Sequence, residues 1–255
     1  MKSPKILLLD IETAPNLGWT WEKYEQNVID FKKGWYVLCF AYKWLDEKKI
    51  HTVALPDFPL YKRDRENDRE LIKAAWKLFD EADIIIAHNG DNFDIKKLNS
   101  RFIIHHFDPP SPYKTIDTLK WARRIGKWNS NKLDDLGAVF EVGRKLPHTG
   151  KHLWLGCMSG DLKSWKTMRA YNAQDVALLQ RVYLRLRGWA PTAPNLNLVT
   201  GRPRGCPRCP DGIVQSRGER YLYSMGFSIK IYRCTGCGFT IKGEKTKLVN
   251  RVVMH

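Results

Sequence analysis

The sequence feature that most constrains the fold is an apolar run that ends in two acidic residues. Residues 7–13 read Leu-Leu-Leu-Asp-Ile-Glu-Thr. The run predicts a buried strand, and because side chains alternate between the faces of a strand, Asp10 and Glu12 point the same way. Two adjacent carboxylates repel each other and lose hydration on burial, which a cation or a shared proton would offset. The alternative is a strand that ends at the surface with both acids in solvent, and the run by itself favours that alternative.

The remaining apolar patterns predict an α/β fold with a sheet of mixed direction. Loops are expected over residues 14–34, with some helix, and over residues 143–160. Residues 161–186 have a helical pattern, which a break near Ala170 would divide in two. Strands are predicted over residues 35–44, 50–55 and 84–87, with a turn at residues 46–49, and helices over residues 67–82, 95–106, 117–125 and 132–140.

The length and composition are typical of a water-soluble globular protein. A chain of 255 residues can hold one full-sized core and a small appendage. Its mean hydropathy is negative. No apolar run approaches the ~20 residues that span a bilayer. The first residues show no signal-peptide pattern. We therefore expect a cytoplasmic protein with no membrane contact.

The positive charge is concentrated toward the C-terminus. The net charge is +16, and the last 55 residues hold half of it, with 11 Lys and Arg against 3 Asp and Glu. A basic excess of this size favours polyanions, chiefly nucleic acid, over an anionic membrane surface. The C-terminal segment is therefore a candidate for nucleic-acid contact.

Two later segments carry further acidic residues. Residues 88–94 read His-Asn-Gly-Asp-Asn-Phe-Asp, so that Asp94 comes where a predicted strand gives way to a helix, at a sheet edge where α/β proteins bind ligands. Asp94 or a neighbour could equally cap that helix. Farther along, Tyr171 and Asp175 are four residues apart and share one helix face. The alternative for Asp175 is a solvated position on an ordinary amphipathic helix.

The three acidic motifs together resemble the DEDD, or DnaQ-like, 3′–5′ exonucleases in their tyrosine subclass. The histidine subclass has His at the position where this chain has Ala170. The resemblance spans residues 5–190, and the chain is also similar to the stand-alone members that bacteriophages carry, which would place it in the cytoplasm of a host. The matching residues are Asp10 and Glu12 in the first motif, Asp94 in the second, and Tyr171 and Asp175 in the third.

The resemblance implies a ribonuclease-H-like, mixed five-stranded sheet flanked by helices and a catalytic site with two metal ions. Four converging carboxylates cannot all ionise without cations, and oxygen ligands suit Mg²⁺ or Mn²⁺. By resemblance, Asp10, Glu12 and Asp175 hold one ion, and Asp10 with Asp94 holds the other. Tyr171 orients the attacking water, because its ordinary pKa near ~10 makes it a poor base at neutral pH.

The expected reaction is release of 5′-mononucleotides from the 3′ ends of DNA, with single-stranded ends favoured. RNA is the alternative substrate. A structure-selective endonuclease and a non-catalytic nucleic-acid-binding adaptor are alternative functions, and replication or repair proteins are possible partners. The candidate substrate-binding residues are Thr13 and Asn89, which the resemblance implies, and the basic residues Lys132 and Arg220.

Four of the six cysteines form two Cys-x-x-Cys pairs near the C-terminus. The pairs resemble a zinc ribbon, in which four thiolates close a structural zinc site. Two disulfides or a redox pair are the alternatives, which a cytoplasmic setting disfavours. Two strands are expected around Met225 and Gly226. We therefore expect an exonuclease domain at residues 1–190, a linker at 191–204 and a small β zinc ribbon at 205–255, whose ligands would be Cys206, Cys209, Cys234 and Cys237.

Overall fold

The computed structural model describes residues 4–24, 27–197, 205–209, 212–222 and 226–248. It divides into two compact units, residues 5–183 and a second unit made up mostly of residues 184–255. Part of the predicted linker, residues 198–204, and the predicted turn residue Met225 lie outside the described residues. Of the helices in the described ranges, none combines the length and the apolar character that a membrane span requires.

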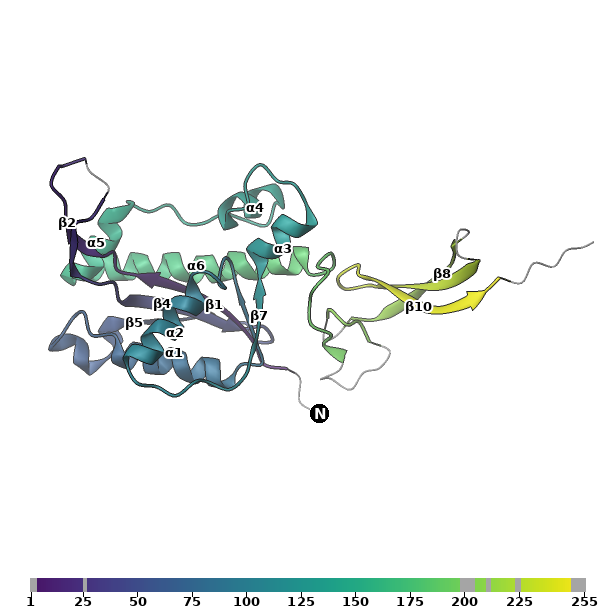
Figure 1. The fold of residues 1–255 in the computed structure, drawn as a ribbon, viewed down its shortest axis with the longest axis horizontal. Coiled ribbons are helices and arrows are strands. Elements are labelled where there is room, and N and C mark those ends of the chain that lie inside the picture. The colour runs from purple at the N-terminus through teal and green to yellow at the C-terminus, as the bar shows by residue number, and fades with distance from the viewer. Residues whose placement is uncertain (1–3, 25–26, 198–204, 210–211, 223–225, 249–255) are drawn as a thin grey trace, which may run out of the picture. The chain divides into compact units, whose positions relative to one another are not determined.

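The first unit is built on a five-stranded mixed sheet (Figure 1). Its central strand, β1, pairs antiparallel with β4 and parallel with β6. The predicted mixed sheet flanked by helices is therefore confirmed. In spatial order the strands are β5 (His51–Ala54), β4 (Val37–Trp44), β1 (Ile6–Thr13), β6 (Ile84–Ala87) and β7 (Lys114–Asp117).

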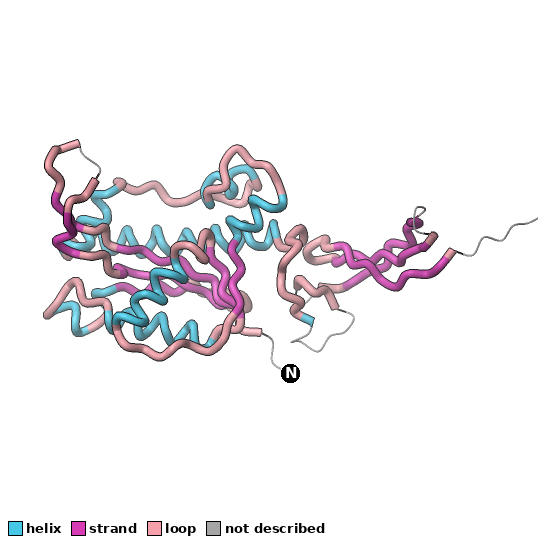
Figure 2. The backbone as a smooth tube through the Cα atoms, in the orientation of Figure 1, coloured by secondary structure: helices cyan, strands magenta, loops and turns pink. Residues whose placement is uncertain are grey.

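Helices cover both faces of this sheet (Figures 1 and 2). Helices α1 (Arg69–Glu81) and α2 (Asp94–Ile104) lie on one side, and the long α6 (Leu162–Leu186) lies on the other. Leu7, Leu8 and Leu9 of β1 are fully buried, as expected of a central strand covered on both faces. The shorter helices are η1 (Leu55–Asp57), η2 (Pro59–Lys62), α3 (Thr118–Ile125), α4 (Leu133–Val139) and α5 (Lys151–Ser159).

The predicted loop at residues 143–160 is wrong, because it contains helix α5. Gly150 has a φ of 61° before the helix, and Gly160 is left-handed after it, with a φ of 87°. These glycines bound the helix, although in the sequence they are typical of a loop. Leu153 and Cys157, four residues apart, are both buried. They supply the single apolar face that such a short helix needs.

The predicted break near Ala170 is also wrong, because α6 is one helix of 25 residues. Its buried side chains recur at spacings of three and four through that point, so one face packs on the sheet without interruption. They are Trp165, Met168, Tyr171, Asn172, Asp175, Val176, Leu178, Leu179, Val182, Tyr183 and Leu186.

Residues 14–34 form strands where a loop with some helix was predicted. β2 (Leu17–Trp19) pairs antiparallel with β3 (Asp30–Lys33) as a separate two-stranded sheet. The short strand β7, which begins before the predicted helix at residues 117–125, was not predicted either. The strand β7 forms by pairing with β6, 30 positions earlier in the chain, which local periodicity does not reveal.

The second unit contains a three-stranded antiparallel sheet in the order β10, β9, β8. β8 (Val214–Leu222) and β9 (Phe227–Cys234) correspond to the two strands predicted on either side of Gly226. The third strand, β10 (Thr240–Lys247), was missed, because its mostly exposed and polar residues carry little apolar alternation.

Candidate active site and cysteine cluster

Three of the predicted acidic residues converge in the first unit. Asp10 and Glu12 leave β1 on the same side, where α6 brings Asp175 against them. One carboxylate oxygen from each of the three lies within 4.8 Å of the others. Asp175 is fully buried, so the solvated alternative for this residue does not hold.

Asp94 joins the cluster through the backbone of β1. Its Oδ1 accepts a hydrogen bond of 3.0 Å from the amide of Ile11, the residue between Asp10 and Glu12. Asp94 is the first residue of α2 and is 3% exposed. The helix begins after Phe93, whose side chain makes no capping bond. The carboxylate of Asp94 therefore joins the start of α2 to the part of β1 that carries Asp10 and Glu12.

Burial, and in second place the neighbouring acids, raise the pKa values of these carboxylates. Burial, followed by the charges of Asp94 and Glu12, raises the pKa of Asp10 well above its ordinary value. Burial and the charge of Asp175 raise the pKa of Glu12 to about 8. Burial raises the pKa of Asp94 to about 7. The cluster therefore resists full ionisation at neutral pH without added positive charge.

Lys145 supplies one positive charge and was missed in the sequence. Its Nζ donates a 2.6 Å hydrogen bond to Oδ2 of Asp175 and lies 3.1 Å from the hydroxyl of Tyr171. Burial lowers the pKa of Lys145, but the neighbouring Asp175 outweighs this effect and holds that pKa above its usual value. Asp134 accepts a 2.7 Å bond from the amide of Lys145 and so anchors its loop. No motif or periodicity singles out a lysine in this Gly- and Pro-containing segment.

Three aromatic side chains lie beside the acids. The rings of His148, Trp154 and Tyr171 contact one another edge to face, with centroids 4.9–6.1 Å apart. The indole N–H of Trp154 donates a 3.1 Å bond to Glu12. Burial and the charge of Asp175 raise the pKa of Tyr171 to about 12, so its hydroxyl stays protonated. The site therefore includes Trp154, which was missed because its helix was read as a loop.

Asn172 is a further residue that the sequence did not reveal. It is fully buried on α6, one position after Tyr171. Its side-chain amide donates a 2.6 Å bond to Oδ2 of Asp10 and a 3.2 Å bond to the carbonyl oxygen of the same residue. Asn172 thereby fixes the orientation of the Asp10 carboxylate.

The donor set fits divalent cations. Four carboxylates face a single ammonium group, that of Lys145, among the described side chains that contact them. Oδ1 of Asp175 is buried, yet it has no hydrogen-bond partner in the described part of the chain. A buried, unpaired carboxylate oxygen is costly unless a cation or donor completes it. Oxygen ligands in this arrangement suit Mg²⁺ or Mn²⁺.

The predicted substrate-binding residues fall in two pockets of the first unit and on one strand of the second unit. Thr13 lines a pocket of about 480 Å³ that is also lined by Trp154. Asn89 and Lys132 line another pocket, of about 540 Å³, together with Arg123 and Lys145. Both pockets share a residue with the acidic site. Arg220 is exposed on β8 of the second unit.

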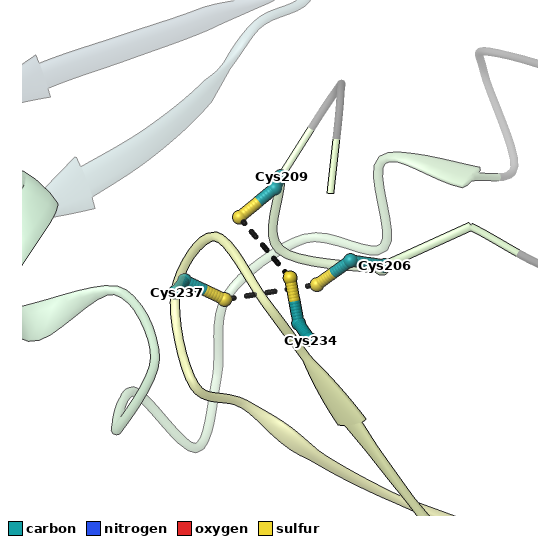
Figure 3. Close-up of side chains that lie close together, drawn as sticks. All are labelled: Cys206, Cys209, Cys234 and Cys237. Carbon is teal, nitrogen blue, oxygen red and sulfur yellow. Dashed lines mark hydrogen bonds between the residues drawn. The ribbon is translucent and has the colours of Figure 1, made fainter. Parts of the chain in front are cut away.

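The four predicted zinc ligands come together in the second unit, as Figure 3 shows. Sγ of Cys206 lies 3.7 Å from that of Cys237, and Sγ of Cys234 lies 3.9 Å from that of Cys209. A tetrahedral Zn²⁺ with Zn–S bonds of ~2.3 Å requires sulfurs about 3.8 Å apart. A disulfide requires ~2.05 Å. The geometry therefore fits zinc and not paired disulfides.

The backbone supports this cysteine cluster. The amides of Arg208 and Gly236 each donate a 3.3 Å bond to the sulfur two residues earlier, Sγ of Cys206 and of Cys234. Such bonds favour the thiolate form that a metal needs. A Cβ at Gly212 would lie 2.5 Å from Sγ of Cys234, so only glycine fits there.

Comparisons with known proteins agree with this fold. The chain is similar to the family B DNA polymerase from the hyperthermophilic archaeon Pyrobaculum calidifontis, with a TM-score of 0.53 and 15% sequence identity. The match covers 74% of this chain and 26% of the polymerase, so the chain spans about a quarter of that protein. At this identity the likeness shows a shared fold. No curated protein matches the sequence.

A family model gives the more specific result. The model of the RNase H superfamily matches residues 25–187, more than half of the chain. The matched range contains Asp94, Lys145, Tyr171 and Asp175, whereas β1 with its two acids precedes it. The chain belongs to the RNase H superfamily.

Proposed function

We propose that this protein is a metal-dependent 3′–5′ exonuclease that releases 5′-mononucleotides from DNA ends, with single-stranded ends favoured. One observation carries the proposal: carboxylates from β1 and α6 meet within 4.8 Å, and Asp94 is bonded to the amide between the two acids of β1. The structural likeness to part of a DNA polymerase supports DNA as the substrate. RNA is the alternative substrate.

The acidic residues have separate roles in this proposal. Asp10, Glu12 and Asp175 would hold one Mg²⁺ or Mn²⁺, and Asp10 with Asp94 would hold a second. Such ions activate a water molecule and stabilise the charge on the leaving 3′ oxygen. Asn172 keeps the Asp10 carboxylate turned toward the cluster.

Tyr171 and Lys145 act on the water and the phosphate. The protonated hydroxyl of Tyr171 would orient the attacking water by a hydrogen bond. A tyrosine at this position of the third motif supports membership of the tyrosine subclass. The ammonium group of Lys145 would offset charge that develops on the phosphate. The resemblance of the three acidic motifs to members of the family that bacteriophages carry supports a phage-type member.

The second unit would bind nucleic acid. We infer an exonuclease domain at residues 1–190, a linker at 191–204 and a zinc ribbon at 205–255 that holds one structural Zn²⁺. Exposed basic residues on the ribbon strands, including Arg217, Arg220 and Lys230, alternate with aromatic ones. This pattern favours phosphate attraction and base stacking. A replication or repair protein is the alternative partner for this unit.

End-labelled oligonucleotides test the activity most directly. Single-stranded DNA and RNA labelled at the 3′ or the 5′ end are incubated with the protein and Mg²⁺, Mn²⁺ or chelator. The proposal predicts immediate release of labelled mononucleotide from 3′-labelled DNA and a ladder of shortening products from 5′-labelled DNA. Internal cuts as the first products would indicate an endonuclease, and binding without cleavage would indicate an adaptor.

The catalytic residues are tested by Asp10→Ala and Asp175→Ala. Each should lower the rate by more than about 100-fold, because even outer-shell partners of metal sites contribute 10–100-fold. Asp135→Asn, in α4 outside the cluster, is the matched control and should leave the rate unchanged. An Asp10→Ala protein that degrades DNA at the parent rate contradicts the proposal.

A further inference from the structure

The hairpin of β2 and β3 exposes several large apolar side chains to solvent. Trp19 is 59% exposed, Phe31 is 56% exposed, and Leu17 and Ile29 are each 50% exposed. Gly18 pairs with Phe31 and Trp19 with Asp30, so the two aromatic rings lie on opposite faces of the hairpin. Each face of this small sheet therefore exposes one aromatic ring, and exposed apolar side chains gathered in one element are a feature of interaction surfaces.

The base of the hairpin forms one wall of the pocket beside the acidic site. Oδ1 of Asn16 accepts a 2.8 Å bond from the amide of Trp35, which joins the two ends of the hairpin. Asn16, Trp35 and Thr13 all line the pocket of about 480 Å³. Thr13 directly follows Glu12 in β1. The hairpin therefore begins at the rim of a pocket whose lining residue Trp154 is hydrogen-bonded to Glu12.

The hairpin carries almost no excess charge. Its described residues contain Lys23, Lys32 and Lys33 against Glu22 and Asp30. Lys33 pairs with Glu66 at 2.7 Å. The ammonium of Lys32 lies 5.5 Å from the ring centroid of Trp19, which turns one face of the indole toward a cation. Attraction of phosphates is thus a minor contribution here, and the aromatic faces are what the hairpin offers to a ligand.

We propose that the β2–β3 hairpin is a stacking platform for unpaired bases of the nucleic-acid strand whose end enters the adjacent pocket. The inference rests on the proposed exonuclease function and adds a substrate contact outside the catalytic cluster. A strand with its terminal nucleotide beside Thr13 passes the rim where the hairpin begins. Aromatic rings can stack on any base, so the platform holds the strand without reading its sequence.

The test uses full-length Trp19→Ala, Phe31→Ala and the double variant. Affinity for a single-stranded 12-mer is measured by fluorescence anisotropy at several salt concentrations, in an Asp10→Ala background that prevents cleavage. Each lost ring should weaken binding about 5- to 100-fold, the range for base–aromatic stacking. The salt dependence should not change, because no phosphate contact is lost. Trp19→Phe should retain most of the affinity.

Two controls separate this platform from other effects. Ile104→Ala removes an exposed aliphatic side chain at the far end of α2 from Asp94 and should leave binding unchanged. Lys132→Ala, in the basic pocket, should weaken binding and also reduce its salt dependence. In protein that retains Asp10, the hairpin variants should hydrolyse the 4-nitrophenyl ester of thymidine 5′-phosphate at the parent rate. This substrate is a single nucleotide, and neither Trp19 nor Phe31 lines the pocket at Thr13.

The outcomes distinguish this inference from the proposed function. Oligonucleotide affinity of the double variant within twofold of the parent overturns the platform, even if the protein is an exonuclease. A change of oligomeric state in the double variant, measured by sedimentation, also overturns it and assigns the hairpin to self-association. If the parent protein hydrolyses neither the oligonucleotides nor the single-nucleotide ester, the proposed function is overturned. The affinities measured by anisotropy would then still decide whether the hairpin stacks on bases.

Discussion

At the scale of single residues, folding brings the carboxylates of Asp10, Glu12, Asp94 and Asp175 together, and in the absence of a cation this raises the free energy of their charged forms. Asp94 is held by a backbone amide and Asp10 by Asn172, so neither can turn away from Glu12 and Asp175. Burial and mutual repulsion then raise the pKa values of these acids. In a site that binds cations, this unfavourable electrostatic free energy is offset when the ion binds between the carboxylates.

This cost predicts how stability depends on pH without added Mg²⁺ or Mn²⁺. The pKa of Glu12 is raised from an ordinary 4.5 to about 8, and that of Asp94 from 3.8 to about 7. Between these values the folded protein binds more protons than the unfolded chain, so stability is lost as pH rises. We expect the melting temperature to fall between about pH 5 and pH 8, as measured by calorimetry.

Added Mg²⁺ provides the complementary measurement. It should raise the melting temperature more at pH 8 than at pH 5, because protons compete with the cation for the same oxygens. Glu12→Gln removes one titrating group and should flatten the decline. A melting temperature without added metal that is constant across this range would show that folding does not raise the pKa values of Glu12 and Asp94.

At the scale of elements, α5 is the piece that completes the site. It brings Trp154 to Glu12 and lines the pocket at Thr13 with Lys151, Trp154 and Leu155. Its contact with α6 depends on Gly156, because a Cβ there would lie 2.1 Å from Oγ and 2.8 Å from Cβ of Ser164. The position of α5 is therefore set by how closely these two helices approach.

Gly156→Ala should separate α5 from α6. Overpacking of this kind costs ~1–3 kcal/mol, which calorimetry would record as a lower melting temperature. Activity on DNA should fall as well, since Trp154 moves away from Glu12. Gly34→Ala is the matched control, because a Cβ there meets nothing within 4 Å. If both variants melt alike, the close contact between the helices is not what holds α5.

At the scale of the whole molecule, half of the net positive charge is carried by residues 201–255, while the carboxylates lie in the first unit. In the proposed function, the second unit would bind a polyanion and the first would hold the catalytic cations. Among the described residues of the small ribbon, the buried ones are Cys206, Arg208, Cys209, Ser228, Ile229 and Cys234. A domain of this size depends on a metal for stability.

Replacement of a cysteine ligand tests this division. Cys234→Ser should lower the zinc content from one per chain toward zero by elemental mass spectrometry. It should also weaken DNA binding and reduce its salt dependence, because the basic strands lose their fold. Removal of residues 201–255 should likewise weaken DNA binding and reduce its salt dependence. Hydrolysis of the single-nucleotide ester should persist in both, and unchanged DNA affinity in both would show that the ribbon does not bind nucleic acid.

The sequence by itself determined the central strand, the acidic motifs and the cysteine pairs, because each depends on local pattern and fixed spacing. Asp10 and Glu12 share a face through strand alternation, and Cys-x-x-Cys spacing suits a metal knuckle. The sequence also predicted the mixed sheet through the order of its elements.

Only the tertiary structure decided which other residues reach the site. Lys145, Trp154 and Asn172 carry no motif, and each contacts an acid that is 30 to 162 positions away along the chain. The strand β7 likewise exists because β6, 30 positions earlier in the chain, pairs with it. Such contacts depend on three-dimensional packing, which local periodicity does not reveal. The same packing brings the two carboxylates of β1 together with Asp94 and Asp175 in a cluster that suits a cation.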